Sequence, residues 1–277
     1  MLLSALWLAA GACGGWLVTR PAPAAIPRLD ALAGRPVLDV ELHTEDHVTV
    51  RGWLVAAGTA SDRCVVLAAG IRGNRTAMLD RARWYLDHGW STLLVDLRGT
   101  GASDPQRVSM GWYEAIDLRA WRRWLGERGF VRVAAHGQSL GAAAIVYSAA
   151  QRGGLDWDFA VLEACYGDIE SALYNRVPWL PLPSLLLWPL RVSATLWMRA
   201  DARWLRPRDL ISRLCVPTLL VCGDTDAKVG AGVTEALRNA SGAADAQLVW
   251  VHGAGHVDLW RVGPELRDAL EQFVARR

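Results

Sequence analysis

The sequence carries no large excess of charge of either sign and no long run of like charges. Its 30 Lys and Arg residues are balanced by 28 Asp and Glu residues, which leaves a formal net charge of +2 over 277 residues. Proteins that bind nucleic acids gather basic residues into clusters or stripes. The interspersed charges argue against a polyanionic partner, and we expect no nucleic acid to bind.

The five cysteines are few, odd in number and irregularly spaced. Cys64, Cys165, Cys215 and Cys222 lie in or beside apolar runs, where a free thiol behaves as a small hydrophobic side chain. Their spacings differ from those of zinc ligands, and the sequence contains no His-Glu-x-x-His motif. The sequence predicts neither a disulfide framework nor a bound metal, and it predicts chemistry without a cofactor.

Charged side chains are missing from the first nineteen residues, which are nearly all apolar. As a helix rising about 1.5 Å per residue, this segment comes close to the thickness of the hydrocarbon core of a bilayer, and Arg20 ends it. A cleavable signal peptide would begin with basic residues, and this segment offers only its amino terminus. We therefore expect residues 1–20 to form a retained single-pass membrane anchor, with a cleaved signal segment as the alternative.

Two further features of the N-terminal region bear on localisation. The tetrapeptide Ala-Gly-Ala-Cys that ends at Cys13 resembles a lipoprotein processing site, so export with lipidation at Cys13 stays an alternative to the anchor. Arg20 and Arg28 follow the apolar segment and favour, by the positive-inside rule, a cytoplasmic position for the rest of the chain. Two arginines do not decide the orientation, and the side of the membrane stays open.

The composition shifts after residue 20. Residues 21–36 are rich in proline and alanine, which indicates an extended tether rather than a helix. We expect the globular domain to begin near Val37 and to continue to residue 277. No internal repeat interrupts it.

Eight apolar runs predict the strands of one sheet. The first two are joined by a polar turn at residues 44–47, as in an antiparallel hairpin, whereas helical stretches separate the later runs. Alternation of strands and helices is typical of a parallel sheet with helices on both faces. We therefore predict an α/β fold with a mostly parallel eight-stranded sheet. The runs are residues 37–42, 48–55, 64–68, 91–95, 131–135, 159–162, 218–222 and 247–251.

One connection between predicted strands, residues 168–208, is too long for an ordinary loop. Its middle, residues 177–190, carries no charge and is flanked by Arg176 and Arg191. Four prolines in this middle part exclude a membrane-spanning helix. We expect an apolar insertion at this point of the chain.

A candidate nucleophile lies in the sequence Gly137-Gln138-Ser139-Leu140-Gly141. The motif follows a predicted strand and precedes a helix of small residues, which is the context that a nucleophile elbow requires. Glycines on either side of the serine permit a turn so tight that it projects the hydroxyl above the edge of the sheet. The motif and its context together predict that Ser139 is a catalytic nucleophile.

A serine hydroxyl needs a histidine to take its proton and a carboxylate to orient that histidine. Asp226 follows the predicted strand 218–222, and His256 follows the last predicted strand. Both therefore emerge at the carboxyl ends of parallel strands, which is the edge where Ser139 also lies. The order serine, acid, histidine along the chain is the one expected for this arrangement.

Other residues could replace the acid or the base. Asp224 could replace Asp226, although an Asp directly after a glycine more often stabilises a turn. Asp258 is a weaker candidate because it lies only two residues beyond the histidine. His252, at the end of a strand, could be the base, and His136 is interpreted as a core histidine or one behind the site.

The negative oxygen that forms during acyl transfer needs two backbone N–H donors. The N–H of Leu140, directly after the nucleophile, is the first candidate. The second should come from the loop after the predicted strand 64–68, where Gly70 and Gly73 allow the backbone to approach a ligand. We choose the N–H of Ile71, with a plain strand-to-helix turn as the alternative interpretation.

These features resemble the α/β-hydrolase superfamily, in particular its small bacterial membrane-associated serine hydrolases, grouped with lysophospholipase-like and acylaminoacyl-peptidase-like sequences. The resemblance implies the α/β-hydrolase fold from about residue 37 to the end, and a lid formed by an insertion after the sixth strand, which residues 168–208 fit. The chain departs from the pattern at Ala69, where such proteins commonly carry histidine, and this departure concerns the rigidity of the loop. The resemblance rests on the Ser139 turn, the contexts of Asp226 and His256, Asp-Leu-Arg-Gly-Thr-Gly-Ala-Ser at 96–103, and Gly-Trp-Tyr-Glu-Ala-Ile-Asp at 111–117.

The expected activity is that of a serine hydrolase. We expect it to cleave a carboxylic ester with an acyl or otherwise apolar group through an acyl-Ser139 intermediate, since an apolar insertion would lie near a membrane-proximal site. A serine peptidase or amidase on the same triad, and a catalytically silent membrane-tethered binding protein, are the alternatives. The expected partners are a small ester substrate and the membrane, through residues 1–19, while the oligomeric state stays open.

Overall fold

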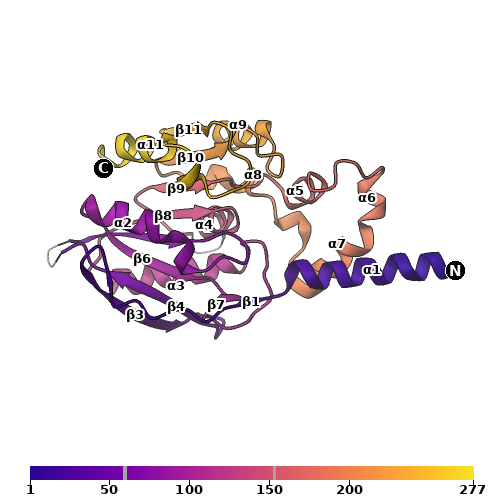
Figure 1. The fold of residues 1–277 in the computed structure, drawn as a ribbon, viewed down its shortest axis with the longest axis horizontal. Coiled ribbons are helices and arrows are strands. Elements are labelled where there is room, and N and C mark those ends of the chain that lie inside the picture. Colours follow the sequence, from indigo (N-terminus) through magenta and orange to yellow (C-terminus); the bar gives the residue numbers. More distant parts are fainter. Residues whose placement is uncertain (59–60, 152–153) are drawn as a thin grey trace.

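A nine-stranded sheet lies at the centre of the structure, a computed structural model that describes residues 1–58, 61–151 and 154–277 (Figure 1). The strand order across the sheet is β11-β10-β9-β8-β5-β6-β4-β3-β2. The strands are β2 (Ala31–Leu32), β3 (Arg35–His43), β4 (Thr49–Val55), β5 (Arg63–Ala68), β6 (Ser91–Asp96), β8 (Arg132–Gln138), β9 (Ala160–Glu163), β10 (Thr218–Gly223) and β11 (Ala246–Val251).

Six neighbouring strands of this sheet, from β11 to β6, pair in parallel, and the remaining three pair antiparallel at one end. The predicted mostly parallel α/β fold is therefore confirmed, but the predicted number of eight strands is wrong. The ninth strand is β2, which turns back on β3 through Ala33 and Gly34, both with positive φ. A two-residue strand in a proline-rich segment has no hydrophobic period that would reveal it.

Residues 21–36 are extended, but they lie along the domain and contact it. Strand β1 (Ala22–Pro23) pairs in parallel with β7 (Thr100–Gly101), outside the main sheet. Further along, Leu32 is buried, and Ile26 and Leu29 pack against the core. These apolar side chains between the prolines explain why a segment predicted as a tether is held against the sheet instead.

Helices cover both faces of the sheet. Alternate side chains of β5 show the division, because Val66 joins the core under α3 and α4 whereas Val65 and Leu67 join the core under α2 and α11. The first face also carries α8 and α9, and the second carries α10. The helices are α2 (Leu79–Asp87), α3 (Glu114–Gly126), α4 (Leu140–Ala150), α8 (Pro207–Leu210), α9 (Ala231–Ala240), α10 (Leu259–Val262) and α11 (Glu265–Val274), with 3-10 turns η1 (Arg75–Met78) and η3 (Ile211–Arg213).

The long connection between β9 and β10 leaves the sheet and returns to it. It forms α5 (Ile169–Tyr174), α6 (Pro183–Leu186), α7 (Trp188–Met198) and η2 (Ala202–Trp204). Pro183 and Pro189 lie in the first turns of α6 and α7, where proline is tolerated, so the apolar middle forms two short helices. Figure 1 shows α6 and α7 away from the sheet, beside the N-terminal helix α1 (Leu2–Thr19).

Helix α1 is, among the residues that the structure describes, the one helix long and apolar enough to cross a membrane. Only Gly11, Gly15 and Thr19 of its residues are buried. A signal sequence would meet the same criteria of length and hydropathy.

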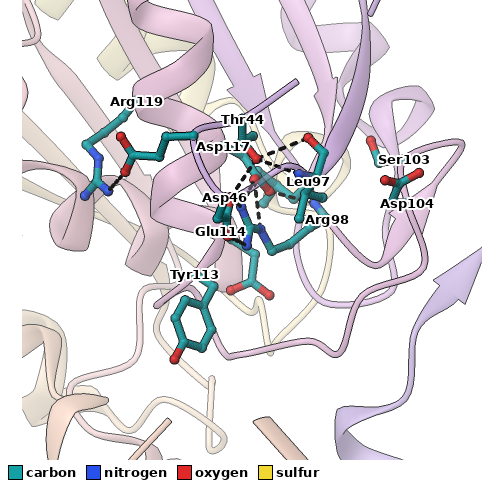
Figure 2. A network of polar contacts seen from close by, with 12 residues as sticks. Thr44, Asp46, Leu97, Arg98, Ser103, Asp104, Tyr113, Glu114, Asp117 and Arg119 are labelled. Atoms are coloured by element: carbon teal, nitrogen blue, oxygen red, sulfur yellow. Dashed lines mark hydrogen bonds and ion pairs between the residues drawn. The ribbon is translucent and has the colours of Figure 1, made fainter. Parts of the chain in front are cut away.

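Arg98 is buried in the loop after β6 and joins three parts of the fold (Figure 2). Its backbone N–H and its Nε donate to the carboxylate of Asp117 on α3, at 2.7 and 2.8 Å. Its Nη2 donates to Asp46, in the turn between β3 and β4, at 2.9 Å. Thr44 also donates to Asp46, at 2.6 Å, and so fixes the carboxylate in the turn. These bonds attach the antiparallel end of the sheet to its parallel part.

We predict that Arg98→Met lowers the free energy of unfolding by about 3–5 kcal/mol, because the buried carboxylate of Asp117 loses its counter-ion. Urea unfolding in mild detergent measures this change. Arg28→Met is the matched control, since it removes an arginine whose ion pair with Asp30 is solvent-exposed, and it should leave the unfolding midpoint unchanged. Equal midpoint shifts for the two variants would contradict the prediction.

Candidate active site

Ser139 lies in a strained turn between β8 and α4. Its backbone has φ 50° and ψ −106°, a conformation that residues with a side chain rarely adopt. A Cβ atom on Gly137 would lie 2.4 Å from the carbonyl carbon of Gly141, and one on Gly141 would lie 2.4 Å from the carbonyl oxygen of Ala68. Both positions therefore require glycine, and the close approach of these backbones holds the serine at the carboxyl end of the sheet.

The imidazole of His256 lies between Ser139 and Asp226. Its Nε2 is 3.3 Å from Oγ of Ser139, and its Nδ1 is 2.8 Å from Oδ2 of Asp226. The ring reaches this position from the loop after β11, in which Gly253 has a positive φ. The three side chains that the sequence singles out thus form one chain of hydrogen bonds.

Asp226 is buried and accepts several hydrogen bonds. The backbone N–H groups of Lys228 and Val229 donate to its Oδ1 at 2.9 and 3.0 Å. Burial would raise the pKa of Asp226, but the hydrogen bond from His256 and these backbone donors outweigh burial and lower the pKa. The ionised carboxylate favours a proton on Nδ1 of His256, which leaves Nε2 free to accept the proton of Ser139.

The other candidates for the acid and the base of the triad make different contacts. Asp224 accepts hydrogen bonds from the His252 side chain, at 3.1 Å, and from the backbone N–H of Gly253, at 2.8 Å. Asp258 pairs with Arg81 at 2.8 Å. In the described part of the chain, no three His, Cys, Asp or Glu side chains are grouped as metal ligands.

The loop after β5 lies beside the serine. A Cβ atom on Gly70 would lie 3.4 Å from Cβ of Ser139, and Ile71, Leu140, Ser139 and His256 line the same cavity. Among the described residues, neither the N–H of Ile71 nor that of Leu140 donates a hydrogen bond to a backbone or side-chain acceptor. These two N–H groups are therefore unused beside the hydroxyl.

The cavity above Ser139 has a volume of about 240 Å³. Its floor is formed by the serine, the histidine and the loop after β5, and its walls come largely from the insertion. Most of the side chains in these walls are apolar, among them Ile169, Leu173, Ala194 and Met198. The arrangement places a hydroxyl and an imidazole at the end of a space that suits an apolar group.

Glu163 and Arg81 behind the serine were not foreseen from the sequence. The carboxylate of Glu163, at the end of β9, lies 2.6 Å from Nε of Arg81 and 2.6 Å from Nε2 of His136. Its backbone carbonyl accepts from the N–H of Ser139 at 2.7 Å. An acidic residue that directly follows the apolar run 159–162 was the signal available in the sequence. His136 is buried in this network, behind the turn.

The chain is similar to known proteins over most of its length. No family model matches the chain. The Mycobacterium tuberculosis protein Rv2307c is 30% identical over 269 residues, which cover 94% of this chain and 85% of the relative. The esterase Pf2001 of Pyrococcus furiosus superimposes with a TM-score of 0.76 at 21% identity and covers 93% of this chain and 98% of its own. The chain belongs to one family with Rv2307c, and it has the α/β-hydrolase fold.

The α/β-hydrolase fold that the resemblance implied is thereby confirmed. A second solved structure, a bacterial membrane phospholipase A, covers 100% of this chain and 93% of its own, with a TM-score of 0.63 at 18% identity. At these identities the two solved structures show the shared fold alone. In this chain, the strained turn follows β8 and the histidine loop follows β11.

We predict that Glu163→Gln lowers the free energy of unfolding by about 3–5 kcal/mol at pH 7, because Arg81 loses its buried counter-ion. Burial would raise the pKa of Glu163, but Arg81 and His136 hold it at about 2, below the usual 4.5. A lowered pKa means that this stability is present above about pH 4.5 and is lost as the pH falls toward 2. The difference between wild type and variant should therefore shrink at pH 3.

Urea unfolding at pH 7 and pH 3 measures this difference. Glu271→Gln is the control, because Glu271 is exposed and its partner is the surface residue His88. A difference between wild type and Glu163→Gln that is the same at both pH values would contradict the assignment of Glu163 as a buried, ionised carboxylate.

Proposed function

We propose that this protein is a serine hydrolase that cleaves a carboxylic ester of an acyl or otherwise apolar substrate. The observation that carries the proposal is the hydrogen-bonded chain from Oγ of Ser139 through His256 to the buried carboxylate of Asp226. A hydroxyl next to a neutral imidazole that is oriented by a carboxylate is the arrangement that activates serine for acyl transfer. The α/β-hydrolase fold is consistent with this chemistry.

Acylation begins when Oγ of Ser139 attacks the ester carbonyl carbon and Nε2 of His256 takes the hydroxyl proton. The carbonyl oxygen becomes negative in the tetrahedral intermediate, and the N–H groups of Ile71 and Leu140 donate hydrogen bonds to it. When the intermediate collapses, the bond to the leaving oxygen breaks, and His256 donates its proton to the departing alcohol. The acyl group remains on Ser139.

Deacylation repeats these steps with water. His256 takes a proton from water as the water oxygen attacks the acyl carbon, and the same two N–H groups stabilise the second intermediate. The bond to Oγ then breaks, and the serine recovers its proton from His256. The products are a carboxylic acid and the alcohol released earlier, so no other reactant is needed.

The apolar walls of the cavity support an acyl chain as the group next to the ester carbonyl. Two solved structures with this fold are named as an esterase and as a membrane phospholipase A, and both names are consistent with ester substrates. A series of activated esters in which kcat/KM is highest for acetate would contradict the assignment of a long apolar group.

We predict that a fluorophosphonate probe labels the wild type and not Ser139→Ala. Asp226→Asn should lower kcat/KM for an activated ester by about 10³–10⁴-fold, because the imidazole loses the partner that holds its tautomer. Asp224→Asn is the matched control two residues away, since Asp224 contacts His252 instead, and it should leave kcat/KM unchanged.

Three results of this experiment would contradict the proposal. Equal labelling of wild type and Ser139→Ala would remove Ser139 from the mechanism. An unlabelled wild type would favour the catalytically silent binding protein. Faster cleavage of an amide than of the ester with the same acyl group would favour the peptidase or amidase.

We also propose that α1 is a retained single-pass anchor, with the hydrolase domain following it. Most of its side chains are exposed and apolar, which favours burial in a bilayer. We expect mass spectrometry of the membrane fraction to recover the uncleaved N-terminus. A chain that begins at a lipid-modified Cys13, or one that has lost α1 and is found outside the membrane, would contradict the anchor.

A further inference from the structure

Helix α1 packs closely against α7 of the insertion. A Cβ atom on Gly11 would lie 2.3 Å from Cβ of Pro189, and one on Gly15 would lie 2.5 Å from Cβ of Ser193. Small residues four apart on one face allow two helices to approach closely, as in membrane helix pairs. Here the partner helix belongs to the same chain, so the glycine face of α1 is already occupied.

Hydrogen bonds join α1 to α7 and to α6 of the insertion. Oγ of Ser193 donates to the carbonyl oxygen of Ala12 at 2.9 Å, and Nε1 of Trp7 donates to that of Leu186 at 2.8 Å. The Ser193 bond sets the position of α7 along α1, and the Trp7 bond attaches the end of α6, because each joins a side chain to one particular carbonyl. Helix α1 and the insertion are therefore one structural unit.

The last turn of α1 is also attached to the domain. Arg72, in the loop beside Ser139, donates to the carbonyl oxygen of Leu17 at 2.9 Å. The carbonyl oxygen of Thr19 accepts from the backbone N–H of Val108 at 3.0 Å. These bonds hold the end of α1 against the loops around the site.

Val18 lies in this last turn and lines the cavity that contains Ser139 and His256. It packs against a small apolar cluster that includes Ala194 and Met198 of α7, which line the same cavity. The neighbouring residue Leu17, in contrast, is exposed on the outer side of the helix. Val18, a side chain of the proposed anchor, thus lines the cavity above the hydroxyl of Ser139.

We propose that the last turn of α1 is a wall of the acyl-binding cavity and that Val18, together with α7, sets the length of acyl chain that the enzyme accepts. This inference rests on the proposed ester hydrolase function. A larger side chain at position 18 occupies space that the chain would fill, and a smaller one lengthens that space. Helix α1 is then part of the substrate site as well as an anchor.

The test compares kcat/KM for activated esters from acetate to palmitate, with the full-length protein in detergent micelles. Val18→Trp should lower kcat/KM for the long esters by about tenfold, the loss expected when roughly two methylenes can no longer be buried. The loss should become smaller as the chain shortens and should be least for acetate, and the fluorophosphonate probe should still label Ser139. Val18→Ala should shift the optimum toward longer chains, and Leu17→Trp, the matched control on the outer side, should reproduce the wild-type profile.

The glycine face provides a second, independent variant. Gly15→Leu should displace α7 and reduce the hydrolysis of long esters as Val18→Trp does, because Ala194 and Met198 move with that helix. Ala9→Leu adds a similar side chain on the exposed side of α1 and should have no effect.

Two outcomes would overturn the inference. Profiles of Val18→Trp and Val18→Ala that superimpose on that of Leu17→Trp would show that α1 does not line the acyl site. A change in oligomeric mass with Gly15→Leu, with an unchanged ester profile, would show that the glycine face binds a second copy rather than α7. Failure of the proposed function is distinguishable, because the probe would then label wild type and Ser139→Ala equally.

Discussion

The close approach of three backbone segments at the Ser139 turn is the constraint on which the site depends. Strand β8, the start of α4 and the end of β5 meet at Gly137 and Gly141, where even a methyl group would overlap a neighbouring backbone. The serine is consequently held in a strained conformation that its own propensity disfavours, and the surrounding sheet must supply the energy that maintains it. Once this turn is fixed, the hydroxyl lies at the carboxyl edge of the sheet. The loop after β5 and the histidine loop can therefore contact it only at that edge.

The parts of the site that could be predicted are those governed by strand ends. Alternating apolar runs identified the parallel strands, and residues that follow such strands gather at one edge. The choice between Asp226 and Asp224 could be argued only from turn preferences, since both follow β10 and differ by two residues. Tertiary geometry separates them, because the carboxylate of Asp226 is buried beside His256 whereas that of Asp224 faces His252.

What could not be predicted depends on partners that are distant in the sequence. Glu163 is recognisable as an acid at the end of a buried strand, but nothing near it indicates Arg81 on α2. Hydropathy marks α1 as apolar without saying that its glycines face α7 rather than lipid or a second copy. Residues 21–36 have the composition of a linker, and only the tertiary contacts, such as the pairing of β1 with β7 and the burial of Leu32, show that they are held.

Buried ion pairs such as Arg81 with Glu163 are poor sources of net stability, because the cost of removing both charges from water offsets much of their attraction. We infer that this one acts by fixing positions. Arg81 contacts Glu163, whose carbonyl accepts from the Ser139 N–H, and it also contacts Asp258, two residues beyond His256. The serine turn and the glycine-containing histidine loop share no strand. The guanidinium of Arg81 connects them, because it contacts Glu163 behind the turn and Asp258 in the loop. The imidazole is held 3.3 Å from the hydroxyl because its Nδ1 is bonded to Asp226 and because Asp258, two residues further along the loop, is bonded to Arg81.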